Sequence, residues 1–175
     1  MEVKLKLIVL SLSHFLHQLA TVVWIGGIWM ILLVILPGAR TSLQSAPMVG
    51  KLMKEITGRF TPLANISIAV LIITGVIIGH YGKNITNPFE LYNHWTPIML
   101  IKHILVTLMV LIHFYRGLLL GPKIGKLSAQ LSESPELSTL STQVTRLQKF
   151  SLNLVKINLA LGLTVLFLTG VVSSR

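Results

Sequence analysis

The sequence predicts an all-α integral membrane protein, a four-helix bundle with amphipathic cytoplasmic loop helices. Two observations predict this class. The chain has 175 residues, of which 53% are apolar and only 11% charged, and the apolar residues gather in runs about as long as a membrane-spanning helix. The runs 63–78 and 159–172 are apolar on nearly all sides, whereas a helix of a soluble bundle has one apolar stripe. We therefore expect a single transmembrane domain over residues 1–175.

Four spans are expected, over about residues 7–36, 62–80, 97–120 and 150–172. Each reaches the length of roughly 20 residues that a helix needs to cross the hydrocarbon core. The first span is expected to stop at Pro37-Gly38, because proline and glycine commonly mark the end of a helix. Its apolar run is too long for a cleaved signal peptide, so we expect a retained helix.

Basic residues predict the orientation of the chain. Most of them fall in the first and third loops, at Arg40, Lys51, Lys54, Arg59, Arg116, Lys123, Lys126, Arg146 and Lys149. The other side has only Lys4, Lys6, Lys83 and Arg175. Because basic loops stay in the cytoplasm, we expect a multi-pass protein of the plasma (inner) membrane with both termini outside. The net charge of +10 is thereby explained without a nucleic-acid partner.

Two loop segments have the apolar spacing of amphipathic helices. In residues 41–60 the apolar positions are four apart, at Met48, Leu52, Ile56 and Phe60. This spacing predicts a helix that lies on the inner membrane face, with lipid as its partner. The segment 137–147 has a similar pattern and is expected to extend the fourth span into the cytoplasm.

Composition excludes several kinds of site. Cysteine is absent, so the chain has no disulfide and no thiolate metal ligand, and any haem is bound non-covalently. Aspartate is absent as well, and none of the five glutamates lies deep in a predicted span. A carboxylate di-iron site, a carboxylate proton relay and hydrolytic chemistry are therefore not expected.

Histidines in the spans predict a metal or cofactor site, since ionisable residues in membrane helices are costly and usually functional. Counted from the inner ends of their spans, His17, His80 and His103 lie at about the same depth, roughly 26 to 28 Å away. We expect these three as metal ligands, with His14 one turn above His17 and His94 in the outer loop. His14, His80 and His94 are equally explained as solvated residues near that surface.

Haem and copper both fit this cluster. A haem needs axial nitrogen ligands and space for a flat ring, and Gly26 and Gly27 beside Trp24 offer such space. Gly75 and Gly79 offer it too, although their spacing also suits close helix packing. Copper favours imidazole together with thioether sulfur, and Met99 lies one turn before His103. Non-covalent haem b is the leading cofactor and copper the alternative.

Lys102 and His113 lie on one face of the third span, because eleven residues turn a helix to within about 20° of its starting direction. Lys102 lies in the outer half of this span, where its long side chain can also reach the outer surface. His113 lies about 16 Å deeper, so it is a candidate cofactor residue that is separate from the outer histidines.

Several motifs carry a family resemblance over about residues 15–116. The segment from His17 through Trp24-Ile25-Gly26-Gly27, Arg59-Phe60, Thr74-Gly75, and the pair Lys102 and His113 follow a shared order and spacing. The chain thereby resembles the CopD-like copper-resistance membrane domain and the related HemJ-type protoporphyrinogen oxidases. The HemJ-like members imply haem bound at His17 with Lys102 needed for activity, which makes Lys102 a candidate catalytic residue. The CopD-like members imply copper handling beside a periplasmic partner.

Three functions follow from these expectations. The leading one is a membrane b-type haem protein with a redox role at an outer-half haem, a candidate haem-dependent oxidoreductase. Either electrons pass between a membrane quinol and a periplasmic acceptor, or oxygen or another small oxidant reacts at the iron. The second is a copper-binding or copper-transporting membrane protein of CopD type. The third is a haem-carrying subunit of a respiratory complex. A homo-oligomer is compatible with each of them.

Overall fold

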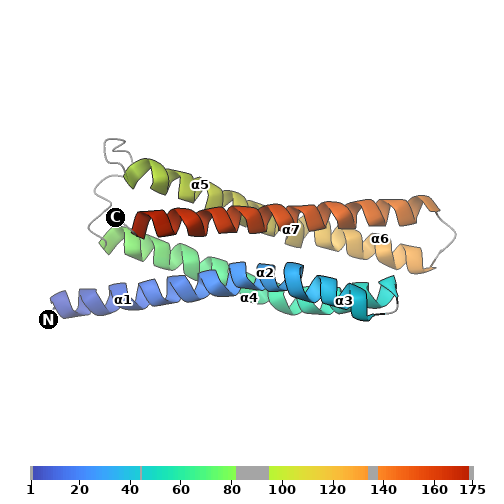
Figure 1. Ribbon diagram of the computed structural model, residues 1–175, viewed down its shortest axis with the longest axis horizontal. Coiled ribbons are helices and arrows are strands. Elements are labelled where there is room, and N and C mark those ends of the chain that lie inside the picture. The colour runs from blue at the N-terminus through green and yellow to red at the C-terminus, as the bar shows by residue number, and fades with distance from the viewer. Residues whose placement is uncertain (1, 44, 82–94, 134–137, 174–175) are drawn as a thin grey trace. The chain divides into compact units, whose positions relative to one another are not determined.

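The computed structural model describes residues 2–43, 45–81, 95–133 and 138–173, and every secondary-structure element within these residues is a helix (Figure 1). The prediction of an all-α membrane protein is confirmed, because four of the helices are long and apolar enough to cross a membrane. The chain divides into two compact units, Met1–Pro97 and Ile98–Arg175. Each unit contains two of these long helices.

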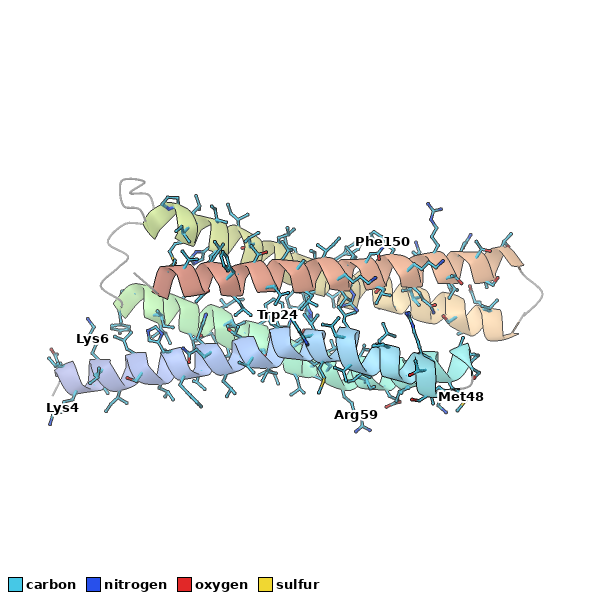
Figure 2. All side chains as sticks on the ribbon, viewed as in Figure 1. Lys4, Lys6, Trp24, Met48, Arg59 and Phe150 are labelled. Atoms are coloured by element: carbon cyan, nitrogen blue, oxygen red, sulfur yellow. The ribbon has the colours of Figure 1, made fainter. Side chains whose placement is uncertain are left out.

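The first long helix of unit 1 is continuous over 41 residues, Glu2–Ser42. It consists of α1 (Glu2–Thr21), the π-turn η1 (Val22–Gly26), α2 (Gly27–Met30), the π-turn η2 (Ile31–Ile35) and α3 (Leu36–Ser42). At 1.5 Å per residue it measures about 60 Å, about twice the thickness of the hydrocarbon core. Figure 2 places Lys4 and Lys6 at its amino-terminal end and Met48 near the opposite end of the unit.

The predicted helix end at Pro37-Gly38 is wrong, because the helix continues to Ser42 and only Leu43 has an extended backbone. Pro37 stands at the first turn of α3, directly after a π-turn. A π-turn changes the hydrogen-bond register, and the first turn of a helix tolerates a residue without an N–H. Proline therefore costs little at this place.

The second helix of unit 1, α4 (Ala46–Tyr81), contains Pro62 in its interior. Residues 46–60 thus form the beginning of a spanning helix, and the predicted separate helix on the inner membrane face is wrong. Pro62 has no N–H to donate to the carbonyl of Gly58, and in the preceding turn the hydroxyl of Thr61 donates to the carbonyl of Thr57 at 2.7 Å.

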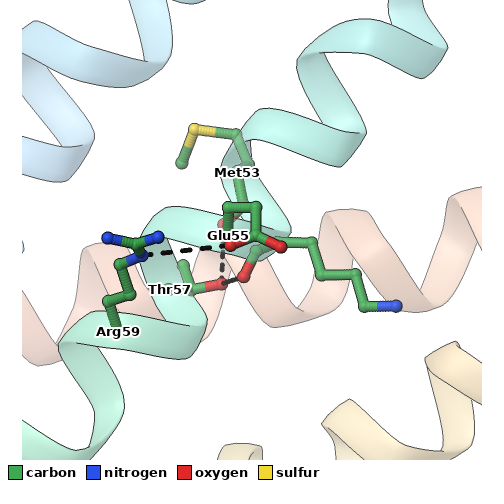
Figure 3. A network of polar contacts seen from close by, with 5 residues as sticks. Met53, Glu55, Thr57 and Arg59 are labelled. Atoms are coloured by element: carbon green, nitrogen blue, oxygen red, sulfur yellow. Dashed lines mark hydrogen bonds and ion pairs between the residues drawn. The ribbon is translucent and has the colours of Figure 1, made fainter.

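Polar side chains lie on the amino-terminal part of α4, before Pro62 (Figure 3). Thr57 donates its hydroxyl to the carbonyl of Met53 at 2.7 Å, and Arg59 approaches Glu55 with an N to O distance of 3.9 Å. The two charged side chains are 88% and 69% exposed, so this ion pair contributes little to stability. The segment is polar enough to stand outside the hydrocarbon core.

The two helices of unit 1 pack along their length, with α1, η1 and α3 against α4. The contact stripe of α4 is made of small residues, and its buried members include Ala64, Ser67 and Thr74. Such stripes let membrane helices approach closely. On the first helix the buried positions follow the same helical spacing, at Ser13, Ala20, Trp24 and Ile28, and His17 lies on this stripe between Ser13 and Ala20.

Unit 2 consists of α5 (Trp95–Phe114), the π-turn η3 (Tyr115–Leu120), α6 (Gly121–Glu133) and α7 (Ser138–Ser173). The first three form one continuous helix, which passes the expected end of the third span at Leu120. The contacts of α7 are with η3 and α6, and α5 leans away from α7 toward its amino-terminal end (Figure 1). The expected extension of the fourth span is confirmed, since α7 begins at Ser138.

The apolar surface of the long helices is mostly unburied. In the most apolar segment of each helix only 11% to 33% of the residues are buried. Large apolar side chains such as Val76 and Phe167 remain about 70% exposed, at 68% and 72%. Contiguous apolar surface of this extent suits lipid rather than water, so the membrane setting predicted from composition agrees with the structure.

Gly27 allows a close approach that can be tested. A Cβ atom at this position would overlap the ring of Phe60 and come within 2.6 Å of its Cζ, whereas a Cβ at Gly26 would meet nothing within 4 Å. We expect Gly27→Ala to lower the stability in detergent by about 1–3 kcal/mol through overpacking, measured by thermal unfolding. Gly26→Ala is the matched control, and Phe60→Leu should restore part of the loss in the Gly27→Ala protein.

Candidate functional site

The best-defined polar contact between the helices of unit 1 joins His17 of α1 to Thr74 of α4. The distance from His17 Nδ1 to Thr74 Oγ1 is 2.8 Å. Thr74 is buried, with 4% of its surface exposed, and His17 is half-buried. Both lie on the stripes along which the two helices pack. A histidine predicted from sequence as a ligand is therefore held in place by a second helix.

The hydrogen bonds of Thr74 assign the tautomer of His17. Thr74 donates its single hydroxyl proton to the carbonyl of Val70 at 2.6 Å, so its oxygen accepts the proton on His17 Nδ1. The lone pair of the neutral imidazole then lies on Nε2, the nitrogen that a metal binds. This arrangement matches the second-shell hydrogen bonds that orient metal-ligating histidines in other proteins.

Glycine 75 flanks the same imidazole. A Cβ atom at Gly75 would lie 3.7 Å from Cε1 of His17, which is ordinary van der Waals contact. The space expected at Gly27 is filled by the ring of Phe60, and Trp24 is buried, with 1% exposed. In this structure Gly27 therefore serves helix packing, while Gly75 adjoins the histidine.

His80 does not share the depth of His17, and that prediction is wrong. Thr74 marks the level of His17 on α4, and His80 lies six residues further along, about 9 Å toward the helix end and about a third of a turn round. The error arises because the first helix continues to Ser42 and α4 begins at Ala46, whereas the prediction placed the inner ends of these spans at Leu36 and Pro62. His80 is exposed and stacks edge-on with Tyr81 at 4.9 Å between ring centres.

The remaining outer histidines divide between the two units. His14 is exposed on α1, one turn from His17, and His94 lies outside the described residues. In unit 2, His103 is exposed, and its Nδ1 lies 2.6 Å from the carbonyl oxygen of Met99. A carbonyl only accepts, so Nδ1 carries the proton and the lone pair lies on Nε2. His103 and Met99 are thus adjacent donors on one face of α5.

Lys102 is half-buried beside His103. Its catalytic role stays a prediction. Deeper in unit 2, His113 is buried, with 8% exposed, as its predicted depth requires. Arg116 follows it by three residues and donates its Nε proton to Oγ of Ser151 on α7, at 3.2 Å.

No group of three or more histidine, cysteine, aspartate or glutamate side chains gathers in the described residues. The histidines occur instead as separate small donor sets, each with its own geometry. His17 is tied to Thr74 in unit 1, and His103 is paired with Met99 in unit 2. The expected convergence of up to five imidazoles is not seen within either unit.

These sites can now be compared with known proteins. A family model described as copper resistance protein D, or CopD, matches residues 54–172, which is more than half of the chain. The chain belongs to the CopD family. The matched range of this CopD protein includes Thr74, Lys102 and His113, and the helix that carries His17 precedes it. Neither curated proteins nor solved structures gave a match.

Thr74 is the functional candidate whose role the sequence did not reveal in this CopD protein. In the sequence, Thr74 was noted only as part of the Thr74-Gly75 motif, and no residue in contact with it could be named. If the first two long helices are joined by a short turn near residue 45, residues about equally far from that turn on the two helices face each other. Thr74 then faces His17. That signal was hidden by Pro37 and Pro62, which suggested that the helices ended early.

Proposed function

We propose that this CopD protein binds copper(I) in the membrane and takes part in copper handling. The observation that carries the proposal is the hydrogen bond from His17 to Thr74, since it presents Nε2 as the metal-binding nitrogen. Membership in the copper resistance protein D family supports copper as the cargo. His17 is an ionisable residue within a predicted span, and such residues usually have a functional role.

Two donor sets suit the binding of copper(I). His17 supplies an oriented imidazole in unit 1, and His103 with Met99 supplies imidazole and thioether in unit 2. Soft thioether ligands favour copper(I), and imidazole suits copper as well. The chain has no cysteine and no aspartate, so histidine and methionine are the donors that it offers for a soft cation.

The proposed orientation places both termini and these donor sets on the outer side of the inner membrane. Basic residues in the two loops on the opposite side support it. Copper would then reach the protein from a soluble carrier at the outer face. A reporter enzyme fused after Arg175 that is active only in the cytoplasm should stay inactive, and cytoplasmic activity would contradict this orientation.

Non-covalent haem b is the second candidate ligand. The oriented Nε2 of His17 suits an axial ligand as well as a copper donor, and Gly75 leaves the flank of the ring without a side chain. Bound haem would supply one-electron redox chemistry, and Lys102 would place a positive charge in the outer half of the span. Quinol oxidation or an oxidoreductase activity would follow only from this alternative.

One experiment separates the two candidates. The full chain, purified in detergent, should bind copper(I) in competition with a colorimetric chelator and should show no Soret band when it is purified from haem-replete cells. A Soret band with sharp reduced α and β bands, together with no copper binding, would contradict the copper proposal. Copper binding without these bands supports it.

A further inference from the structure

A repeated pattern on α5 points to a second donor pair deeper in the membrane. Methionine and histidine occur four residues apart twice, at Met99 with His103 and at Met109 with His113. Residues four apart share a face of a helix. The first pair stands at the surface, where His103 is exposed. The second pair is buried, with 1% of Met109 and 8% of His113 exposed.

The contact between Arg116 and Ser151 shows which part of α7 lies at the level of this pair. Met109 precedes Arg116 by seven residues and Asn158 follows Ser151 by seven, and the helices run in opposite directions. Seven residues make nearly two turns, about 10.5 Å, and return to within about 20° of the same face. Asn158 therefore lies at the level of Met109, on the face of α7 that carries Ser151.

Asn158 is itself an unusual residue for this place. Only 2% of it is exposed, and its Oδ1 has no hydrogen-bond partner among the described residues. A buried acceptor without a partner costs about 1–3 kcal/mol, and the hydrocarbon core offers no water to satisfy it. An oxygen of this kind indicates a bound cation or a bound hydrogen-bond donor.

We propose that Met109 and His113 form a second copper(I) site, deeper than the pair of Met99 and His103, with the oxygen of Asn158 as a third donor. Thioether sulfur and imidazole are the ligands that copper favours. The inference rests on the proposed copper-handling function and extends it. The deeper site would bind copper within the membrane, after the ion leaves the pair of Met99 and His103 near the outer surface.

The positive charge of Arg116 predicts how the copper affinities of the two sites compare. Arg116 lies three residues beyond His113, about 4.5 Å along the helix, and its guanidinium opposes a cation in a medium of low polarity. Lys102 lies next to the outer pair of Met99 and His103, but it is less buried than Arg116 and therefore opposes a bound cation less. The deeper site is therefore expected to hold copper more weakly than the outer one, which favours onward release.

The deeper site is tested by counting copper in the full-length protein. Copper(I) is supplied under reducing conditions with a competing chelator, and the variants are Met109→Leu and His113→Gln. Each should bind about one copper ion per chain fewer than the unaltered protein, because each removes a soft ligand. The exposed Met30→Leu is the matched control and should bind as much copper as the unaltered protein.

A spectroscopic measurement keeps the test independent of folding in these variants. In Met99→Leu protein loaded with copper(I), X-ray absorption should still show a copper–sulfur distance, which is lost when Met109→Leu is added. Absence of sulfur around copper in the Met99→Leu protein overturns the deeper site. Unchanged copper counts in Met109→Leu and His113→Gln overturn it as well.

A failure of the deeper site can be distinguished from a failure of the proposed copper-binding function. If His17→Ala and His103→Ala lose copper while the inner variants lose none, the deeper site is wrong and the copper proposal stands. If the unaltered protein binds no copper at all, the proposed function and the deeper site fall together.

Discussion

Replacing His17 by alanine is expected to weaken copper(I) binding at unit 1 by more than about 100-fold, since changes to the hydrogen-bonding partners of metal ligands alone cost about 10- to 100-fold. A second helix orients His17 through Thr74, whose Oγ1 lies 2.8 Å from His17 Nδ1. Its loss removes the nitrogen donor itself. Chelator competition with purified protein measures the change.

The control for this substitution is His80→Ala. The depth count from sequence placed both histidines at one site, whereas the structure separates them by about 9 Å along the helix axis. The structure therefore predicts that His80→Ala binds copper almost as well as the unaltered protein. Equal losses in the two variants would show that His80 joins His17 after all and would contradict the helix register described above.

Replacing Thr74 by valine is expected to weaken copper binding by about 10- to 100-fold, in line with other second-shell substitutions. Valine keeps the shape of threonine but removes the oxygen that accepts the proton of His17 Nδ1. The imidazole then loses the bond that selects its tautomer and orientation. Thr74→Ser keeps that oxygen and should retain most of the affinity, which a purely steric role of Thr74 would not predict.

A matched control exists on α7. Thr164 is exposed and also donates its hydroxyl to the carbonyl four residues earlier, that of Ala160, at 3.0 Å. Thr164→Val therefore makes the same chemical change without a histidine partner and should leave copper binding unchanged. Thermal unfolding of the two valine variants separates any loss of helix association, worth about 1 kcal/mol for such a bond, from the loss of metal affinity.

Much of the fold follows from the sequence alone. The length of the apolar runs is a local property, and a run of about 20 residues has few structures open to it in lipid. For this reason the helical class, the four helices long enough to span a membrane and the helical extension of the fourth could be predicted. The location of His17 and His113 within spans follows from the same counting.

The helix ends could not be predicted in this way. Pro37 and Pro62 are strong stop signals in isolation, yet the structure continues through both. A π-turn precedes the first of them, and the second lies in the interior of α4. Such local changes of hydrogen-bond register depend on packing against a neighbouring helix, which a periodicity count does not contain.

The partners of the candidate residues depended most on the tertiary structure. Composition and spacing determined by themselves that this chain spans a membrane with helices and carries histidines and methionines as its donors. Which residue faces which was decided by the register of the hairpins, because each residue gained or lost at a turn shifts a helix by 1.5 Å and rotates it by about 100°. Through that register His17 contacts Thr74 rather than His80, and Asn158 lies level with Met109.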